Sequence, residues 1–535
     1  MRTFPTVDTP ADQTYDLPDA GGQEPLAEYR IANVKTSSTD KDASSAFLKY
    51  ADFSHYAESF NGMEDENIVQ AIPNAKASEW MEENIPLFEC PQRNFEEMYY
   101  YRWWSLRKHI KETPVGYGMT EFLVQRSYSD KYNLIACAIG HHIYESRWLR
   151  DPKYLDQIIH TWYRGNDGGP MKKMDKFSSW NADAVLARYM VDGDKDFMLD
   201  MTKDLETEYQ RWERTNRLKN GLYWQGDVQD GMEESISGGR NKKYARPTIN
   251  SYMYGNAKAL SIMGILSGDE GMAMRYGMRA DTLKSLVEND LWNTRHQFFE
   301  TMRTDSSANV REAIGYIPWY FNLPDTTKKY EVAWKEIMDE KGFSAPYGLT
   351  TAERRHPEFR TRGVGKCEWD GAIWPFASAQ TLTAMANFMN RSAQSVLTDS
   401  IYFHQMERYV ESQYHRGRPY IGEYLDEVTG YWLKGDQERS RYYNHSTFND
   451  LIITGLVGLR PRADHTVEVN PLLPDGRWDW FCLDNLLYHG HYLTILWDKY
   501  GDRYHRGKGL LVLVDGKIVG QSDTLERIVC KDVLE

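Results

Sequence analysis

The chain has 535 residues, which is enough for one large domain and a smaller one. It carries 64 Lys and Arg against 78 Asp and Glu, a formal net charge of −14, and this acidic balance argues against nucleic acid or an anionic membrane as a partner. No stretch is long and apolar enough to span a bilayer, and a neutral sugar remains compatible as a substrate.

The cysteines, Cys90, Cys137, Cys367, Cys482 and Cys530, are odd in number, widely spaced and without a CxxC pair. They predict neither a disulfide framework nor a zinc site. The first residues lack the apolar core of a secretory signal. We therefore expect a soluble protein, cytoplasmic as the sequence stands, or periplasmic or secreted if a leader has been removed.

Aromatic residues make up 13% of the chain, with 17 Trp and 36 Tyr. This content fits a large aromatic core. It fits a sugar site equally well, because the apolar faces of sugars stack on flat rings.

Residues 1–45 are rich in Pro, Asp, Thr, Ser and Gly and are predicted to be a loosely ordered N-terminal segment. From there to residue 460, pairs of helices joined by a short hinge recur. Gly is expected to end one helix and Asp to cap the next. The hinges are Asp151-Pro152, Gly193-Asp194 and Ser267-Gly268-Asp269, and later helices are expected at 330–339, 374–390, 400–414 and 447–459.

Antiparallel helix pairs fit an open solenoid or a closed toroid. A solenoid should show a sequence repeat of fixed period, and none is found. The long loops between the pairs carry Trp, Asp, Glu and Gly, which favours a ring whose loops gather at one end. We predict a mainly α fold, with a toroidal catalytic domain over 46–460. A small β-rich region follows over 461–535, where Asp515-Gly516 indicates a tight hairpin turn.

Three segments combine acidic residues with aromatic residues and glycine. The first follows Trp224 and reads Gln-Gly-Asp-Val-Gln-Asp-Gly-Met-Glu-Glu-Ser over 225–235, with Asp230 and Glu233 among its acids. A run of acids is often only a solvated loop. Here the interleaved Gly, Met and Trp favour a packed turn.

The second segment, Glu-Trp-Asp-Gly-Ala-Ile-Trp-Pro over 368–375, has Trp369 and Trp374 on either side of a Gly turn. It fits a packing corner, or a wall on which a sugar stacks while Asp370 holds a hydroxyl. The third, Gly-Glu-Tyr-Leu-Asp-Glu-Val-Thr-Gly-Tyr-Trp over 422–432, puts Glu423 in a loop between two helices.

Cleavage of a glycosidic bond needs two acid functions. One carboxyl, kept protonated by an apolar setting, protonates the leaving oxygen, and an ionised one activates water or attacks the anomeric carbon. The first and third segments can supply one each. Their glutamates, Glu233 and Glu423, are 423 − 233 = 190 residues apart, so only the fold can bring them together.

Taken in order, the three segments resemble signatures of trehalase-like and glycoside hydrolase family 63 enzymes. Asp-Gly-Met-Glu-Glu-Ser over 230–235 resembles Ser-Gly-Met/Trp-Asp-x-Ser, and Trp-Asp-Gly-Ala-Ile-Trp over 369–374 resembles Trp-Arg-Gly-Pro-x-Trp. The stretch 422–430 resembles Glu-x-Tyr-Asp-Pro-x-Thr-Gly. The resemblance spans roughly residues 90–460 and is nearest to the mannosylglycerate-hydrolase-like branch.

This resemblance implies an (α/α)6 toroid and an inverting mechanism, with Glu233 as general acid and Glu423 as general base. Inversion needs the two carboxyls about 6.5–9.5 Å apart, which leaves room for the attacking water. Three departures stand out. Glu233 replaces Asp; Asp230 replaces Ser and is therefore an alternative acid; and Asp370 replaces Arg, which leaves the identity of the sugar open.

Other residues are candidates for sugar contacts, each with a core role as the alternative. Trp103 lies at the start of the toroid, Trp180 and Tyr252 lie near the starts of two helices, and His445 precedes the last long helix. His141 and Glu145 are one helical turn apart, but the order and third ligand of a zinc hydrolase are missing. We expect no metal and no cofactor.

The sequence thus predicts a glycosidase that releases a terminal sugar from an oligosaccharide or glycoconjugate. One alternative is a polysaccharide lyase with Tyr252, Tyr254 or His445 as base. The net acidity and the lack of an Arg/Lys cluster near the motifs argue against it. The other is a toroid that binds glycans without turnover. The oligomeric state is left open.

Overall fold

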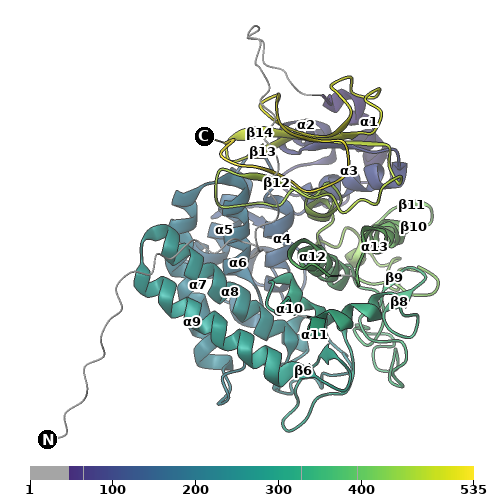
Figure 1. The fold of residues 1–535 in the computed structure, drawn as a ribbon. Helices are drawn as coiled ribbons and strands as arrows, with labels where there is room; N and C mark the ends of the chain where they lie inside the picture. Colours follow the sequence, from purple (N-terminus) through teal and green to yellow (C-terminus); the bar gives the residue numbers. More distant parts are fainter. Residues whose placement is uncertain (1–46, 64, 327, 395, 535) are drawn as a thin grey trace, which may run out of the picture.

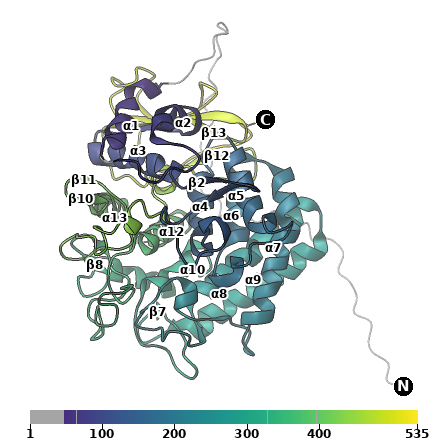
Figure 2. The same cartoon turned by 180° about the vertical axis from the view of Figure 1, so that it is seen from behind.

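The computed structural model describes residues 47–534 except 64, 327 and 395, so the predicted segment 1–45 lies outside the described residues. Helices pack in antiparallel pairs, and a β-sheet lies against one end of them together with α1–α3 (Figures 1 and 2). The predicted fold class, an (α/α)6 toroid with a small β-rich C-terminal region, is confirmed.

The helices differ widely in length, and in the described part of the chain none is both long enough and apolar enough to cross a membrane. In chain order they are α1 (Ser54–Asn61), α2 (Ala77–Asn84), α3 (Arg93–Arg107), α4 (Ile139–Ser146), α5 (Lys153–Arg164), α6 (Asn181–Asp192), α7 (Lys195–Asn216), α8 (Pro247–Ser267), α9 (Glu270–Leu286), α10 (Ile317–Tyr320), α11 (Lys328–Glu331), α12 (Pro375–Arg391), α13 (Asp399–Ser412) and α14 (Asn449–Leu451).

Short two-stranded pairs occur in the loops between the helices, and the longer strands lie near the C-terminus of the chain. The strands are β1 (Leu87–Glu89), β2 (Ile110–Thr113), β3 (Gly116–Met119), β4 (Trp224–Gln225), β5 (Tyr244–Ala245), β6 (Trp292–Asn293), β7 (Phe298–Phe299), β8 (Ser344–Ala345), β9 (Gly348–Leu349), β10 (Tyr414–His415), β11 (Arg418–Pro419), β12 (Val467–Val469), β13 (Trp480–Tyr488), β14 (His491–Asp498), β15 (Gly509–Val514), β16 (Lys517–Ser522) and β17 (Ile528–Cys530).

Two of the predicted helix hinges have the expected chemistry. Gly193 ends α6 with φ of 71°, and the Asp194 carboxylate accepts the Phe197 N–H at 2.9 Å at the start of α7. Gly268, with φ of 78°, and Asp269 do the same between α8 and α9. Such helix ends need a residue in the left-handed backbone conformation, which glycine adopts without steric cost.

Three predicted helices differ from the structure. The helix before the Asp151-Pro152 hinge, whose apolar spacing begins at Tyr132, starts only at Ile139, because Tyr132 has a left-handed φ of 62°. In place of the helix expected over 330–339, α11 ends at Glu331 and a 3-10 helix follows over Val332–Ile337. The helix expected over 447–459 is shorter: α14 continues as a π-helical turn over Ile452–Leu456.

The largest sheet joins two distant parts of the chain. Its strand order is β1-β13-β14-β15-β16, so β1, from the N-terminal side of the toroid, pairs antiparallel with β13. The β15–β16 hairpin turns at Asp515 and Gly516, which have φ of 48° and 76°. Two consecutive left-handed residues are typical of the tight hairpin turn predicted for this dipeptide.

A buried carboxylate docks α14 onto α4. Glu145, on α4, accepts backbone N–H groups of Phe448, Asn449 and Asp450 at 2.9–3.1 Å. Asp450 in turn accepts from Arg147 at 2.8 Å. The first backbone N–H groups of a helix have no partner within the helix. The Glu145 carboxylate supplies one for α14 and so fixes the segment just before this helix.

Replacing Glu145 with Gln is expected to lower the free energy of unfolding by about 2–3 kcal/mol, because the new NH2 group faces buried N–H donors. Urea unfolding followed by circular dichroism measures it. Glu79→Gln, at an exposed surface ion pair with Lys76, is the control and should change stability by less than about 0.5 kcal/mol. Equal stabilities of the two variants would contradict this role for Glu145.

Candidate active site

The first acidic segment forms the loop between β4 and β5. Asp227 organises it, since its carboxylate accepts the N–H of Val228 at 2.8 Å and those of Gly239 and Arg240 at 3.2 Å. Gly231 turns the chain with φ of 72°. The acids therefore lie in a packed turn, as the sequence pattern predicts.

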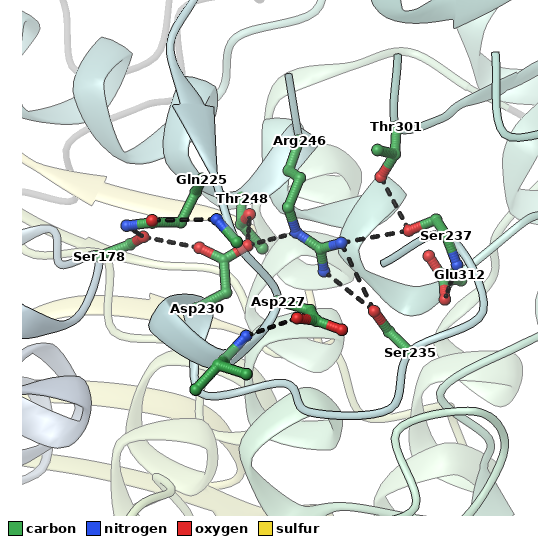
Figure 3. A network of polar contacts seen from close by, with 12 residues as sticks. Ser178, Gln225, Asp227, Asp230, Ser235, Ser237, Arg246, Thr248, Thr301 and Glu312 are labelled. Atoms are coloured by element: carbon green, nitrogen blue, oxygen red, sulfur yellow. Dashed lines mark hydrogen bonds and ion pairs between the residues drawn. The ribbon is translucent and has the colours of Figure 1, made fainter. Parts of the chain in front are cut away.

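Asp230 anchors this loop to the toroid (Figure 3). Its Oδ1 accepts the Ser178 hydroxyl at 2.6 Å, and its Oδ2 accepts Arg246 Nε at 2.6 Å and the Thr248 hydroxyl. The side chains of Asp230 and Arg246 have no exposed surface. Both oxygens of the alternative acid are therefore occupied by structural contacts.

Glu233, three residues further on, is partly exposed. Its pKa is raised to about 7, chiefly by burial, and the negative charges of Glu423 and Asp227 add to the shift. A carboxyl with this pKa holds a proton near neutral pH and can give it up to a leaving group.

Glu423 lies in the loop after β11 and is only 5% exposed. Its Oε2 is 3.1 Å from Lys434 Nζ and 3.2 Å from Arg439 Nη2. Glu423 is thus in ion-pair contact with two cations. The two glutamates have different surroundings: burial and the charges of two acids outweigh Arg240 at Glu233, whereas Glu423 is paired with Lys434 and Arg439.

The two loops meet at Cys367. The pKa of its thiol is raised to about 12, first by burial and then by the charges of Glu233 and Glu423. Lys434 Nζ, the partner of Glu423, is 3.9 Å from its sulfur. The neighbouring Lys366 contacts both loops: its Nζ lies 3.7 Å from Glu234, and its carbonyl accepts the Tyr424 hydroxyl. The structure therefore brings Glu233 and Glu423 to the same end of the toroid.

A third carboxyl, Glu121, belongs to the same group, and the sequence reasoning missed it. The Tyr443 hydroxyl donates to its Oε1 and the Cys137 thiol to its Oε2 at 3.1 Å. Burial raises its pKa to about 7, with contributions from the charges of Glu423 and Glu233. Glu121 follows β3 without any acidic or aromatic motif, and Tyr443 is 322 residues away, so no pattern in the chain points to it.

The second segment forms a corner that joins the third. The ring of Trp374 is stacked between those of Trp369 and Tyr424, with centroid distances of 4.5 and 4.6 Å. The backbones of Ile373 and Leu425 exchange two hydrogen bonds of 3.0 Å. Both faces of Trp374 are covered, so a sugar can reach only its edge. The packing corner, one of the two interpretations of this segment, describes this geometry.

Asp370 is fully buried in the same corner. Its Oδ2 accepts the backbone N–H groups of Arg362 at 2.6 Å and Gly363 at 3.0 Å. A Cβ on Gly363 would lie 2.7 Å from Oδ1 of Asp370, so glycine permits this approach. The carboxylate predicted to hold a sugar hydroxyl is therefore bound to the loop 360–363, which nothing in the motif indicated.

Arg360 links the second segment to the third. Its guanidinium lies 2.9 Å from Glu368, 2.6 Å from Asp426 and 2.6 Å from Glu427. Asp426 also accepts the Thr429 N–H at 2.8 Å, which forms the turn after Glu423. Three carboxylates around one cation fix the loop on which Glu423 lies.

Three further predicted residues lie under this corner in one aromatic cluster. Trp180 is 4.8 Å from Tyr252 and 6.3 Å from Phe376 between ring centroids, and Phe376 is 5.8 Å from His445. All are nearly fully buried. Burial holds the pKa of His445 well below its usual range, and the backbone of Glu423 is among the groups that act on the ring. His445 is therefore a neutral imidazole beside the Glu423 loop.

The remaining two predicted residues have other contacts. Trp103 is fully buried in α3, edge to face with Tyr99 at 6.2 Å, which is a core position. Trp224 is partly exposed in β4, and Lys243 Nζ lies 4.2 Å from its ring centroid. Within the described residues, these contacts join neither ring to Glu233 or Glu423.

His141 and Glu145 do not form a metal site. Glu145 binds the start of α14, while the ring of His141 packs edge-on against Phe376 at 4.5 Å. Over the part of the chain that the structure describes, no group of three or more His, Cys, Asp or Glu is placed to hold a metal ion.

A cavity of about 250 Å³ lies elsewhere, between α7 and α9. The carboxylate among its described lining residues, Glu213, is paired with Arg279 at 2.8 Å. Cleavage of a glycosidic bond needs a second acid that this lining does not offer. The cluster of Glu121, Glu233 and Glu423 therefore defines the candidate site.

Comparison with known proteins shows the family of this chain. Residues 131–446, more than half of the chain, match the model of the mannosylglycerate hydrolase MGH1-like glycoside hydrolase domain. The chain belongs to this family. The match includes all three motif segments, and the predicted resemblance to mannosylglycerate-hydrolase-like glycoside hydrolases is confirmed. Residues 459–520 match the C-terminal domain of glycosyl hydrolase family 65.

Solved structures extend the comparison. One named "Sialidase" is 93% identical, covers 100% of this chain with a TM-score of 0.91, and is matched over 49% of its own length. This chain therefore spans about half of that protein. The GH63 mannosylglycerate hydrolase from Thermus thermophilus in complex with glucose is 12% identical over 66% of this chain and 99% of its own, with a TM-score of 0.50. The GH78 family rhamnosidase of Bacillus sp. GL1 is 11% identical over 77% of this chain and 40% of its own, with a TM-score of 0.54. These two share the fold.

The raised pKa of Glu233 has a consequence for stability. Its folded value, about 7, exceeds its ordinary value of 4.5, so between these pH values the folded state binds more protons than the unfolded state. Stability from this group is therefore present at low pH and is lost as the pH rises through about 7. Glu233→Gln removes the ionisation, so the variant should exceed the wild type by about 1–2 kcal/mol near pH 8 and differ little near pH 5.

Urea unfolding at the two pH values measures this difference. Glu112→Gln, at an exposed position of β2, is the matched control and should show no pH-dependent gain. A Glu233→Gln variant that is no more stable than the wild type at the higher pH would contradict the assignment.

Proposed function

We propose that this MGH1-like domain is an inverting glycoside hydrolase that releases a terminal sugar from an oligosaccharide or glycoconjugate, with Glu233 as general acid and Glu423 as general base. The observation that supports this most is the contrast between the two carboxyls. The pKa of Glu233 is raised to about 7, while Glu423 is paired with Lys434 and Arg439. An acid and a base at one site need such different surroundings.

In this proposal the Glu233 proton moves to the glycosidic oxygen as the bond between that oxygen and the anomeric carbon breaks. Glu423 takes a proton from a water molecule, whose oxygen attacks the anomeric carbon from the opposite face. The sugar leaves with inverted configuration. Glu233 is then ionised and Glu423 protonated, and exchange of one proton with solvent at each carboxyl restores the starting state.

Asp230 is the weaker candidate for the acid. Arg246 pairs with it at 2.6 Å, and the hydroxyls of Ser178 and Thr248 bind it. Both of its oxygens are therefore engaged in structural contacts. We therefore assign Asp230 the role of holding the loop of Glu233.

The other predicted residues divide by their contacts. Asp370 and Trp374 support the Glu423 loop, and Trp103 supports the core, so we propose that they act through packing. Sugar contacts remain proposed for the aromatic cluster and its edges, at Trp180, Trp224, Tyr252, Trp369 and His445. The near-complete burial of Glu423 favours a chain end over the middle of a polysaccharide, because an internal sugar needs an open groove.

Glu233→Gln and Glu423→Gln are each expected to lower kcat at least about 100-fold while the circular dichroism spectrum is unchanged, because each removes one proton transfer. The substrate panel consists of aryl glycosides and natural disaccharides, and includes sialosides, mannosylglycerate and rhamnosides. Glu234→Gln is the matched control: this neighbour is paired with Arg240 at 2.9 Å and should keep most of the activity. Full activity in both test variants would overturn the assignment.

The first-formed anomer distinguishes inversion from retention. Proton NMR during the first minutes of hydrolysis should show the anomer opposite to that of the substrate, before mutarotation mixes the two. Retained configuration would refute the water-activating role of Glu423. An unsaturated product absorbing in the ultraviolet would indicate a lyase instead, and binding without any product would indicate a glycan-binding domain.

A further inference from the structure

Glu121 binds two residues, Cys137 and Tyr443, and each of them contacts one of the loops that carry the proposed acid and base. Its Oε2 accepts the Cys137 thiol at 3.1 Å, and Cys137 packs against Gly231, where a Cβ would lie 3.5 Å from the cysteine Cβ. Its Oε1 accepts the Tyr443 hydroxyl, and the Tyr443 backbone N–H donates to the Ile421 carbonyl at 3.2 Å. Gly231 and Ile421 each lie two residues before the proposed catalytic glutamate of their loop.

The backbone around Glu121 is held as firmly as its side chain. The carbonyl of Glu121 accepts the Asn444 N–H at 3.0 Å, and the carbonyl of Thr120 accepts Asn444 Nδ2 at 3.2 Å. The ring of Phe122 packs edge-on against Tyr443 at 4.3 Å. With only 3% of its surface exposed, the carboxyl has one position between the two loops.

We propose that Glu121 is a positioning residue that joins the Glu233 loop to the Glu423 loop through Cys137 and Tyr443, and that its own ionisation is coupled to that of Glu233. The predicted effect on kcat rests on the proposed function, whereas the link between the two loops rests on the contacts of Glu121.

The surroundings of Glu121 explain the coupling. Its two donors, a thiol and a phenol, are themselves neutral, because burial raises the pKa of Cys137 and of Tyr443 well above their usual range. No cation pairs with the Glu121 carboxyl among the described residues. The titratable groups that act on it or through its partners are Cys137, Tyr443, Tyr128, Glu233, Glu423 and Lys176.

The coupling has a definite sign. A negative charge on Glu121 disfavours a second one on Glu233, so the acid keeps its proton to a higher pH while Glu121 is present. Removing the Glu121 charge should make Glu233 easier to ionise. The alkaline limb of the pH profile should then move to lower pH.

The test variant is Glu121→Gln, and Glu96→Gln is its matched control. Glu96 is a partly buried carboxyl that also accepts a tyrosine hydroxyl, from Tyr56 at 2.8 Å, and its pKa is likewise raised by burial. It lies on α3, and Glu233 and Glu423 are not among the groups that act on it. A merely structural loss should therefore be alike in the two variants.

Infrared difference spectra need no substrate. In the wild type, the C=O band of protonated carboxyl groups should fall as the pH rises through neutrality. Glu121→Gln should lose part of this titration, and the remainder should move to lower pH by about half a unit or more. Tyr443→Phe, which removes a hydrogen bond to the charged form, should move the Glu121 part to higher pH and serves if Glu121→Gln does not fold. Spectra of both variants that match the wild type would overturn the proposal.

Kinetics with any substrate that Glu233→Gln no longer hydrolyses provide the second readout. Glu121→Gln should lower kcat about tenfold, leave KM within about twofold, and shift the alkaline limb downward by about half a pH unit. Glu96→Gln should shift nothing. A lower kcat with an unchanged alkaline limb of the pH profile would show that Glu121 acts only through core packing and would overturn the proposal. If no substrate is turned over, the proposed function fails while the infrared result still decides the coupling.

Discussion

The site depends on buried carboxyl groups, some of which are paired with cations while others are not. Asp230 is neutralised by Arg246, and Glu423 by Lys434 and Arg439. Burying a charge is tolerated where an opposite charge is near, and where none is near the group stays protonated instead. Glu121 has no cation paired with it among the described residues. Arg240 acts on Glu233, but burial and the charges of Glu423 and Asp227 outweigh it, and each of the two carboxyls has a pKa raised to about 7. The proton-donating character of Glu233 and Glu121 thus follows from burial that nearby cations do not offset.

Polar centres give the long loops a fixed shape. Asp227 gathers the backbone of the first loop, and Arg360 gathers three carboxylates of the second and third. The helices supply a rigid base, since Glu145 fixes the start of α14 and with it the segment that holds Tyr443 and His445. A loop held by several charge-assisted hydrogen bonds can keep a reactive group in one place without regular secondary structure.

The departures from the family signatures have structural partners within this chain. The acid at 230 replaces a serine of the family pattern, and the guanidinium of Arg246 balances its charge. The acid at 370 replaces an arginine and binds the N–H groups of residues 362 and 363. Each change is thus accommodated within the loops, where members of one fold differ most.

The sequence by itself determined the helical pairs, their Gly-Asp hinges, the β-hairpin at Asp515-Gly516 and the segments in which the proposed acid and base lie. These features depend on local conformational preference and on periodicity. The sequence did not separate Asp230 from Glu233, nor a sugar-stacking Trp374 from a packing one, because both members of each pair fit the same local pattern. Only the tertiary structure decided these surroundings, since burial, cation pairing and ring stacking come from residues far away in the chain. Glu121 is the clearest case: its significance comes from Tyr443 and from the charges of Glu233 and Glu423, which only folding brings near it.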